Sequence, residues 1–189
     1  MIKGEWGIVK RGIVSVFGAS IASPDSPPYR EAYQLGRLLA QAGYTVMNGG
    51  YGGTMEASSK GAKEAGGRTI GVTVSLFERS GYRAGPNPYL DEVIQYPTLS
   101  ERLHHLVTRC DAAVALRGGI GTLSEMALMW SFLQVGEIPR RPLILLGQDW
   151  ADLIEKLCGD GSYVRPSDRA LIRVAAAPEE VITLLERWE

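Results

Sequence analysis

The chain contains the stretch Ala112-Ala113-Val114-Ala115-Leu116-Arg117-Gly118-Gly119-Ile120-Gly121-Thr122-Leu123-Ser124-Glu125. Its first five residues are apolar and too few for a helix, so they predict a short buried strand. A three-glycine turn follows, and an apolar helical pattern begins at Thr122. The start of a helix carries free N–H groups and partial positive charge, which favour a phosphate. We therefore expect an anion site at residues 117–125, overlooked by the Glu125 carboxylate one turn into the helix.

The same succession of strand, turn and helix recurs along the chain. Periodicity and glycine or proline positions predict strands at 12–18, 44–47, 68–74, 92–95, 112–116, 142–146 and 171–174. They predict helices at 28–42, 55–65, 99–109, 122–134, 150–157 and 178–188, and a long irregular segment at 75–91. Alternating elements of this kind indicate an α/β fold: one doubly wound, Rossmann-like parallel sheet flanked by helices, in a single domain over residues 1–189.

Composition narrows the classes of partner. The formal net charge is -1, with 20 basic and 21 acidic residues, which argues against a nucleic-acid partner or an anionic membrane surface. No apolar run approaches the roughly 18 residues of a membrane span, and the N-terminal residues lack an apolar signal region. We expect a cytoplasmic protein. The two cysteines, Cys110 and Cys158, fit neither a disulfide framework nor a zinc spacing, so we expect reduced thiols and no metal site.

In a doubly wound sheet the ligand lies beyond the carboxyl ends of the strands. Four predicted loops have that position: 18–20, 48–54, 96–102 and 117–125. The first of them lacks the Gly-x-Gly-x-x-Gly dinucleotide fingerprint, and the chain contains no Gly-x-x-x-x-Gly-Lys-Ser/Thr loop. Both an NAD oxidoreductase and a P-loop NTPase are therefore disfavoured.

The glycine loops resemble those of a known family. Residues 118–125, Gly-Gly-Ile-Gly-Thr-Leu-Ser-Glu, resemble the Gly-Gly-x-Gly-Thr-x-x-Glu signature of the LOG family, the phosphoribohydrolases that include cytokinin-activating enzymes and bacterial proteins once labelled lysine decarboxylases. Val16-Phe17-Gly18-Ala19-Ser20 is similar to the family's first strand and turn, and residues 49–55 to its second glycine loop. Glu101-Arg102 stands where the family carries an arginine. The resemblance runs from about Ile13 to Leu146.

The resemblance implies cleavage of the N-glycosidic bond of a nucleoside 5'-monophosphate, typically adenine-based, to free base and ribose 5-phosphate without a cofactor. Carried over by position, Arg102 and Glu125 are the catalytic pair. The implied substrate- and phosphate-binding residues are Gly18, Ser20, Gly49, Gly50, Gly52, Gly53, Thr54, Gly118, Gly119, Gly121 and Thr122. A carboxylate and a cation also suit the chemistry, because bond breaking builds positive charge on the ribose and negative charge on the base.

Other interpretations of the same residues stay open. Thr122-x-x-Glu125 and Thr98-x-x-Glu101 both fit a helix capping box, which we favour for Glu101. The chain also departs from the family pattern, with Arg117 in place of a proline, Leu103 in place of a lysine and Glu56 in place of a glycine. These departures keep a second function open, that of a non-catalytic nucleotide or molybdenum-cofactor carrier. Lysine decarboxylation is rejected, since the five lysines lie near the N-terminus or in polar helical contexts.

The helix predicted at 122–134 has almost no polar face, with Met126, Met129, Trp130, Phe132 and Leu133 among its residues. A surface helix should have one polar side. We therefore expect this helix to lie at the centre of a homodimer interface. His104 and His105 are adjacent, so they point about 100° apart on a helix and form no chelating pair.

Overall fold

The computed structural model describes residues 11–82 and 85–188, and the expectation about an N-terminal signal region falls on residues outside them. Seven strands form one parallel sheet in the order β4-β3-β2-β1-β5-β6-β7. This confirms the predicted α/β doubly wound fold. The strands are β1 (Ile13–Phe17), β2 (Thr45–Asn48), β3 (Thr69–Val74), β4 (Glu92–Tyr96), β5 (Ala112–Ala115), β6 (Leu143–Leu146) and β7 (Ile172–Ala175).

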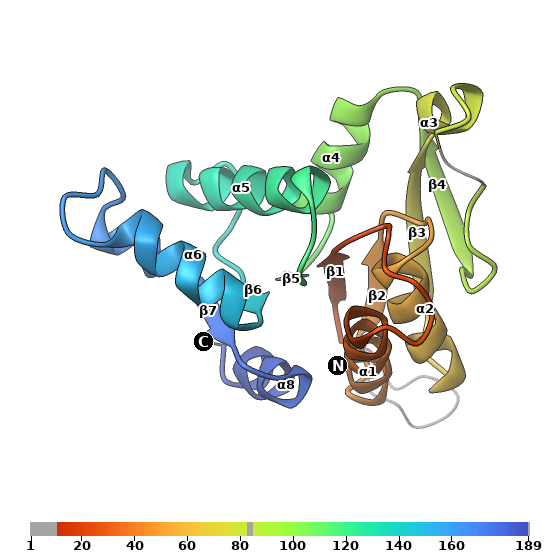
Figure 1. The fold of residues 1–189 in the computed structure, drawn as a ribbon, viewed down its shortest axis with the longest axis horizontal. Helices are drawn as coiled ribbons and strands as arrows, with labels where there is room; N and C mark the ends of the chain where they lie inside the picture. The colour runs from red at the N-terminus through yellow and green to blue at the C-terminus, as the bar shows by residue number, and fades with distance from the viewer. Residues whose placement is uncertain (1–10, 83–84, 189) are drawn as a thin grey trace.

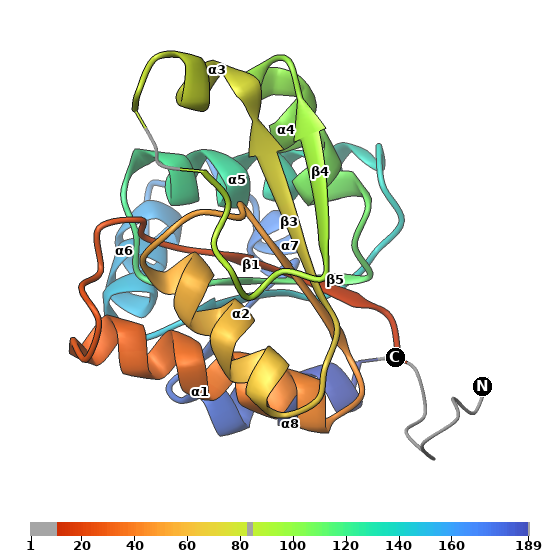
Figure 2. The same ribbon diagram turned by 90° about the vertical axis from the view of Figure 1, so that its right-hand side faces the viewer.

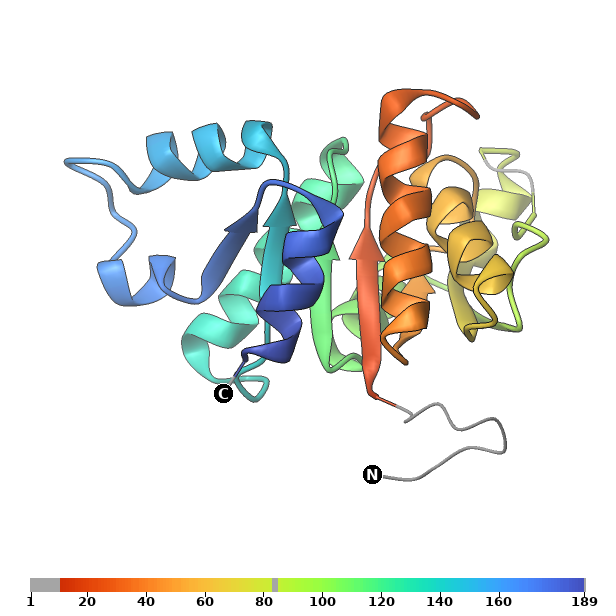
Figure 3. The ribbon, with the colours of Figure 1, turned by 90° about the horizontal axis from the view of Figure 1, so that it is seen from below.

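Helices cover both faces of the sheet (Figure 1). They are α1 (Pro27–Gln41), α2 (Thr54–Glu64), α3 (Ser75–Arg79), α4 (Leu99–Thr108), α5 (Ile120–Val135), α6 (Gln148–Cys158), α7 (Pro166–Arg169) and α8 (Pro178–Glu186). One core cluster joins the sheet to α1, α2 and α8, and the other joins it to α4, α5 and α6. Figure 3 shows α1 and α8 together in front of the strands, and Figure 2 shows α4 and α5 on the opposite side.

The interior strands are apolar because they are buried on both faces. Every residue of β2, β5 and β6 is buried except Thr45, and these strands consist mainly of Val, Ile, Leu and Ala. Such near-continuous apolar runs are typical of parallel sheets covered by helices. At the edge, β4 alternates between half-buried and exposed residues. No helix in the described ranges is long and apolar enough to cross a membrane.

The structure corrects the sequence prediction at three places. The segment predicted to be irregular at 75–91 begins with the short helix α3, whose Phe77 ring lies 5.9 Å from the Tyr51 ring. The short helix α7 begins at Pro166, where no element is predicted from the sequence. Finally, α5 begins at Ile120, because Gly119 is its extended N-cap residue and accepts a hydrogen bond from Leu123 N at 3.0 Å. Thr122 is therefore inside the first turn and not at its cap.

The strand order reverses between β1 and β5, which are neighbours in the sheet. The chain leaves β1 toward α1 on one face and leaves β5 toward α5 on the other. Loops that diverge to opposite faces open a crevice at this switch point, where α/β sheets bind their ligands. The loop at 18–20 and the signature loop at 117–125 are the two loops that start there.

Candidate active site

The first two glycine loops are joined to each other at the switch point. Thr54, the first residue of α2, donates hydrogen bonds from its backbone N (2.8 Å) and its Oγ1 (3.0 Å) to the carbonyl oxygen of Ala19. Gly53 has φ +69°, and a Cβ there would lie 2.3 Å from the same oxygen and 2.6 Å from the carbonyl carbon of Ser20. A Cβ on Gly18 would lie 2.3 Å from Thr54 Oγ1. The structure thus brings these four predicted site residues together through close backbone packing.

A buried side chain shapes the second glycine loop from within. Asn48, at the end of β2, accepts a hydrogen bond from Gly50 N at 2.8 Å through its Oδ1. Its Nδ2 lies 2.8 Å from Ser59 Oγ and 2.9 Å from the carbonyl oxygen of Met55, which ties the loop to the first two turns of α2. Buried polar groups of this kind are costly unless satisfied, so Asn48 holds the loop in one conformation.

Arg102 and Glu125 form a buried ion pair, with Arg102 Nη1 3.4 Å from Glu125 Oε1. Their side chains are only 7% and 9% exposed. Arg102 lies on α4 and Glu125 on α5, so the pair links two helices that flank β5. The structure therefore places the two predicted catalytic residues side by side, 23 positions apart in the sequence.

Two further hydrogen bonds fix the Arg102 guanidinium. Its Nε donates to the carbonyl oxygen of Val72 in β3 at 2.8 Å, and its Nη2 donates to that of Gly49 at 3.3 Å. A Cβ on Gly49 would lie 2.0 Å from Nη2, so only glycine permits this approach. Because the planar guanidinium is held along three directions, its orientation is set before any ligand binds.

Tyr51, which is not among the residues predicted from the sequence, supports this arrangement. The Tyr51 side chain is 2% exposed, and its ring centroid lies 5.9 Å from Arg102 Cζ. Its hydroxyl accepts a hydrogen bond from Val74 N at 2.9 Å and donates one to the carbonyl oxygen of Val74 at 3.2 Å. An aromatic face beside a buried guanidinium stabilises the cation. Its place inside the second glycine loop was the signal that could have identified it.

The electrostatics of the pair are dominated by burial. Burial disfavours the charged carboxylate and raises the pKa of Glu125 from 4.5 to about 7, although the positive charge and hydrogen bond of Arg102 lower it. The carboxyl group thus titrates near neutral pH. A group with such a pKa can exchange a proton with substrate or water under ordinary conditions.

The signature loop provides room and free N–H groups beside the pair. A Cβ placed on Gly119 or Gly121 would meet no described atom within 4 Å, so both glycines face open space. The first N–H groups of α5, beginning at Ile120, have no partner within the helix and point toward its N-terminal end. Gly118 packs against the buried Thr122, whose Oγ1 would lie 2.0 Å from a Cβ at that glycine.

The capping-box alternatives are resolved differently for the two glutamates. Thr98 is the N-cap of α4 and accepts a hydrogen bond from Glu101 N at 3.3 Å, as expected for a cap. Glu125, by contrast, contacts Arg102, and α5 has no side-chain cap. The carboxylate of Glu125 is therefore not a capping group.

The three departures from the family pattern lie near the site but do not enter the ion pair. Arg117 Nη2 lies 2.5 Å from Asp149 Oδ2 at the start of α6, in an exposed ion pair. Glu56 Oε1 accepts a hydrogen bond from Tyr29 OH at 3.2 Å. Leu103 is half-buried on α4.

Gly52 and Gly50 complete the second glycine loop. A Cβ on Gly52 would come within 4 Å of one described atom only, Glu56 Oε2, at 4.0 Å.

The histidines and cysteines lie elsewhere. His104 is exposed, and His105 Nδ1 lies 2.8 Å from Tyr96 OH, with its pKa lowered mainly by burial. Cys110 is buried and Cys158 half-buried, and both are free thiols. Within residues 11–82 and 85–188, no three His, Cys, Asp or Glu side chains gather as a metal site would require.

Comparisons with known proteins agree with the glycine loops and the sheet. The SLOG cluster4 family matches residues 11–160. Cytokinin riboside 5'-monophosphate phosphoribohydrolase LOG7 of Arabidopsis thaliana is 31% identical over 93% of this chain and 82% of the plant protein. The Mycobacterium tuberculosis protein named cytokinin riboside 5'-monophosphate phosphoribohydrolase is 34% identical over 69% of this chain, but the match spans only 65% of that protein.

A solved structure is similar over nearly the whole fold. The molybdenum cofactor binding protein from Rippkaea orientalis superposes with a TM-score of 0.72 at 29% identity, covering 94% of this chain and 96% of that one. The structural similarity therefore covers the sheet and the helices and not only the signature loop. Since the family match covers most of the chain, and a LOG protein exceeds 30% identity over most of its own length, the chain belongs to the LOG family and to the SLOG cluster4 family.

Proposed function

We propose that the chain hydrolyses the N-glycosidic bond of a nucleoside 5'-monophosphate, of adenine type, to free base and ribose 5-phosphate. The observation that carries the proposal is the buried Arg102–Glu125 pair, 3.4 Å apart, next to the N-terminal end of α5. A phosphate at that helix end would place a ribose near the pair. The similarity to proteins named phosphoribohydrolases supports the same reaction class.

The proposed reaction breaks the bond between the ribose C1' and a ring nitrogen and forms a bond from C1' to a water oxygen. In the transition state the ribose carries positive charge, which the ionised Glu125 carboxylate stabilises, and the same carboxylate accepts a proton from the attacking water. The departing nitrogen takes up negative charge and is then protonated from solvent water, while Glu125 returns to solvent the proton that it took from the attacking water. The fixed guanidinium of Arg102 stabilises that negative charge, but it is a poor proton donor.

The proposed phosphate site is the first turn of α5. Gly118, Gly119, Gly121 and Thr122 supply its backbone, and the open space at the two exposed glycines permits a phosphate to approach. The loops at 18–20 and 49–54 form the facing wall. The predicted small-molecule ligand is therefore bound mostly by backbone groups and by one buried ion pair.

The test is incubation of the purified protein with AMP and related monophosphates, followed by chromatography of free base and ribose 5-phosphate. Glu125→Gln preserves the shape of the side chain and removes its charge, so base release should fall at least about a hundredfold. Glu155→Gln is the matched control, because Glu155 is exposed on α6. Equal release by the wild type and Glu125→Gln would refute the role of Glu125.

A carrier function is the second candidate. It is favoured by the similarity to the molybdenum cofactor binding protein of Rippkaea orientalis across 94% of this chain. A carrier would bind the cofactor or a nucleotide stoichiometrically and release no base. Calorimetry with the same ligands, run beside the chromatographic assay, distinguishes binding without turnover from catalysis.

We also propose a homodimer that forms through α5. In the isolated chain this helix buries one stripe, which includes Met126, Met129 and Leu133. Its other side leaves Ile120 79% and Val135 70% exposed. Large exposed apolar residues on one helix suggest a partner surface.

The single-domain assignment over residues 1–189 and the cytoplasmic location stay predictions from the sequence.

A further inference from the structure

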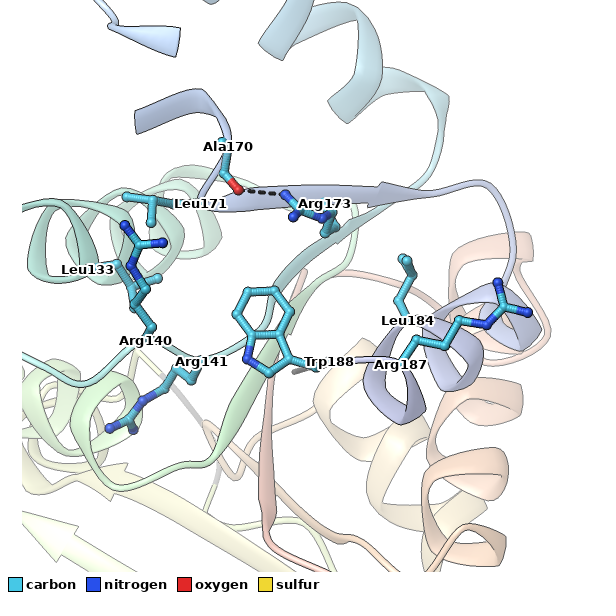
Figure 4. A pocket seen from close by; sticks show the side chains of 9 residues that line it. All are labelled: Leu133, Arg140, Arg141, Ala170, Leu171, Arg173, Leu184, Arg187 and Trp188. Atoms are coloured by element: carbon cyan, nitrogen blue, oxygen red, sulfur yellow. Dashed lines mark hydrogen bonds between the residues drawn. The ribbon is translucent and has the colours of Figure 1, made fainter. Parts of the chain in front are cut away.

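A pocket lies at the amino ends of β6 and β7, whereas the candidate active site lies at the carboxyl ends of the strands; Figure 4 shows the pocket from close by. Its volume is about 320 Å³, at the lower end of the range for small-molecule pockets. It is reached from the amino ends of two strands, since Arg141 precedes β6 and Leu171 precedes β7. The lining residues are Leu133, Arg140, Arg141, Ala170, Leu171, Arg173, Leu184, Arg187 and Trp188.

The lining is strongly cationic for a chain of net charge -1. Four of its side chains are arginines and none is acidic. Two acidic residues close by in sequence are engaged elsewhere. Asp168 accepts hydrogen bonds from Arg165 and Gln134, and Glu186 pairs with Arg11. The positive charge of the pocket is thus not compensated by these carboxylates, which favours an anionic ligand.

Two of the arginines are held in place by the protein itself. Arg173 donates from Nη1 to the carbonyl oxygen of Ala170 at 2.5 Å, and its Cζ lies 5.8 Å from the centre of the Trp188 ring. Both hydrogen bonds recorded for this side chain use Nη1, which leaves Nε and Nη2 for a ligand. Arg141 is bonded to backbone carbonyls, including those of Thr108 and Pro139. Its role is therefore structural.

The other two arginines, Arg140 and Arg187, differ in the direction in which their guanidinium groups point. Neither Arg140 nor Arg187 has a side-chain hydrogen bond or ion pair with any residue in the described ranges. Figure 4 shows the guanidinium of Arg140 near Leu171, whereas the guanidinium of Arg187 points away from Trp188. Arg140 and Arg173 are therefore the two lining arginines whose unused guanidinium nitrogens can contact a ligand in the pocket, from different parts of its wall. Guanidinium groups bind phosphate oxygens in pairs of parallel hydrogen bonds.

The remaining wall is apolar. Leu133, Leu184 and the indole of Trp188 line it, so a ligand with an uncharged planar part would gain contact area there. We propose that this pocket binds a nucleoside phosphate, with its phosphates on Arg140 and Arg173 and its base against Trp188 and Leu184. This site is separate from the proposed phosphate site at the start of α5.

The indole N–H signal of Trp188 is a local reporter of binding. In ¹⁵N-labelled full-length protein it is identified by its loss in Trp188→Phe, and ADP, inorganic pyrophosphate and adenosine are then titrated separately. ADP should shift the signal saturably. Arg140→Gln and Arg173→Gln should each weaken ADP binding by about tenfold or more, because each removes a charge-assisted hydrogen bond. Arg37→Gln, which removes an exposed arginine on α1, should leave the affinity unchanged.

Three results would overturn the proposal. They are a Trp188 signal that ADP does not move, an ADP affinity that survives the double substitution of Arg140 and Arg173, and an equal loss of affinity in Arg37→Gln. Pyrophosphate that binds as tightly as ADP would overturn the assignment of the nucleoside, and adenosine that binds as tightly would overturn that of the phosphates. Because the reporter and the variants lie at the amino ends of the strands, failure here leaves the proposed hydrolase site untouched.

Discussion

Replacing Glu125 with glutamine should remove a large part of the pH dependence of folding stability. The carboxyl has a pKa of about 7 in the folded protein, against 4.5 without the fold. The folded state therefore binds more protons than the unfolded state between these two values. The contribution of this group is fully present below about pH 4.5 and is lost as the pH rises through about 7.

The magnitude follows from the two pKa values. The rise from 4.5 to about 7 corresponds to about 3 kcal/mol over the complete titration. Between about pH 5 and pH 8, linkage gives a fall of about 2–3 kcal/mol in the free energy of unfolding from this group alone. In Glu125→Gln the side chain is neutral at every pH, so that part of the fall should be absent.

Urea unfolding followed by circular dichroism at a series of pH values measures both curves. The difference in free energy of unfolding between the wild type and Glu125→Gln should change by about 2–3 kcal/mol from about pH 5 to pH 8, and Glu155→Gln should follow the wild type. Parallel curves for the wild type and Glu125→Gln would show that Glu125 titrates at an ordinary pKa. The argument from burial would then be wrong.

Further predictions concern the candidate active site and the proposed dimer interface. Arg102→Lys loses the fork of hydrogen bonds that joins the guanidinium to Val72, Gly49 and Glu125. It should lower the free energy of unfolding by about 3 kcal/mol and abolish most base release, as measured by urea unfolding and chromatography. Tyr51→Phe leaves the buried N–H of Val74 without its hydroxyl partner and should cost about 1–3 kcal/mol of stability in the same unfolding assay. If the ionised Glu125 is the active form, kcat/KM for AMP should rise with pH through about 7, and a flat profile would contradict this. Ala127→Glu, at an exposed position on α5, should convert the proposed dimer to a monomer in light scattering, whereas a monomeric wild type would remove the basis of that proposal.

The elements were predictable where the local signals were strong. Every predicted strand and helix exists in the described residues, because apolar runs bounded by glycine or proline indicate buried strands and helix ends with little ambiguity. The two short helices α3 and α7 were missed, since elements of four or five residues produce no periodic pattern. The start of α5 was placed two residues late because a threonine appeared to be the cap, while the structure uses the extended Gly119.

The candidate site was predictable as a set of residues but not as an arrangement. Spacing and resemblance selected Arg102 and Glu125, yet nothing in the sequence indicated that they form a buried pair. That pairing depends on α4 and α5 packing beside each other, which is a tertiary contact. The support from Asn48 and Tyr51 also depends on tertiary structure, because each acts through hydrogen bonds that only the folded backbone provides, although the place of Tyr51 inside the second glycine loop pointed to it.

The chemistry proposed for the pair requires both a buried carboxylate and a cation held in a fixed position. A carboxylate on the surface of α5 would titrate well below neutral pH and would be solvated, so it would stabilise a developing charge only weakly. Burial raises the pKa of Glu125 to about 7, and the nearby cation keeps it from rising further. That cation must not move when the carboxylate changes charge. Arg102 is suited to this requirement because its hydrogen bonds to the carbonyl oxygens of Val72 and Gly49 involve neither oxygen of Glu125.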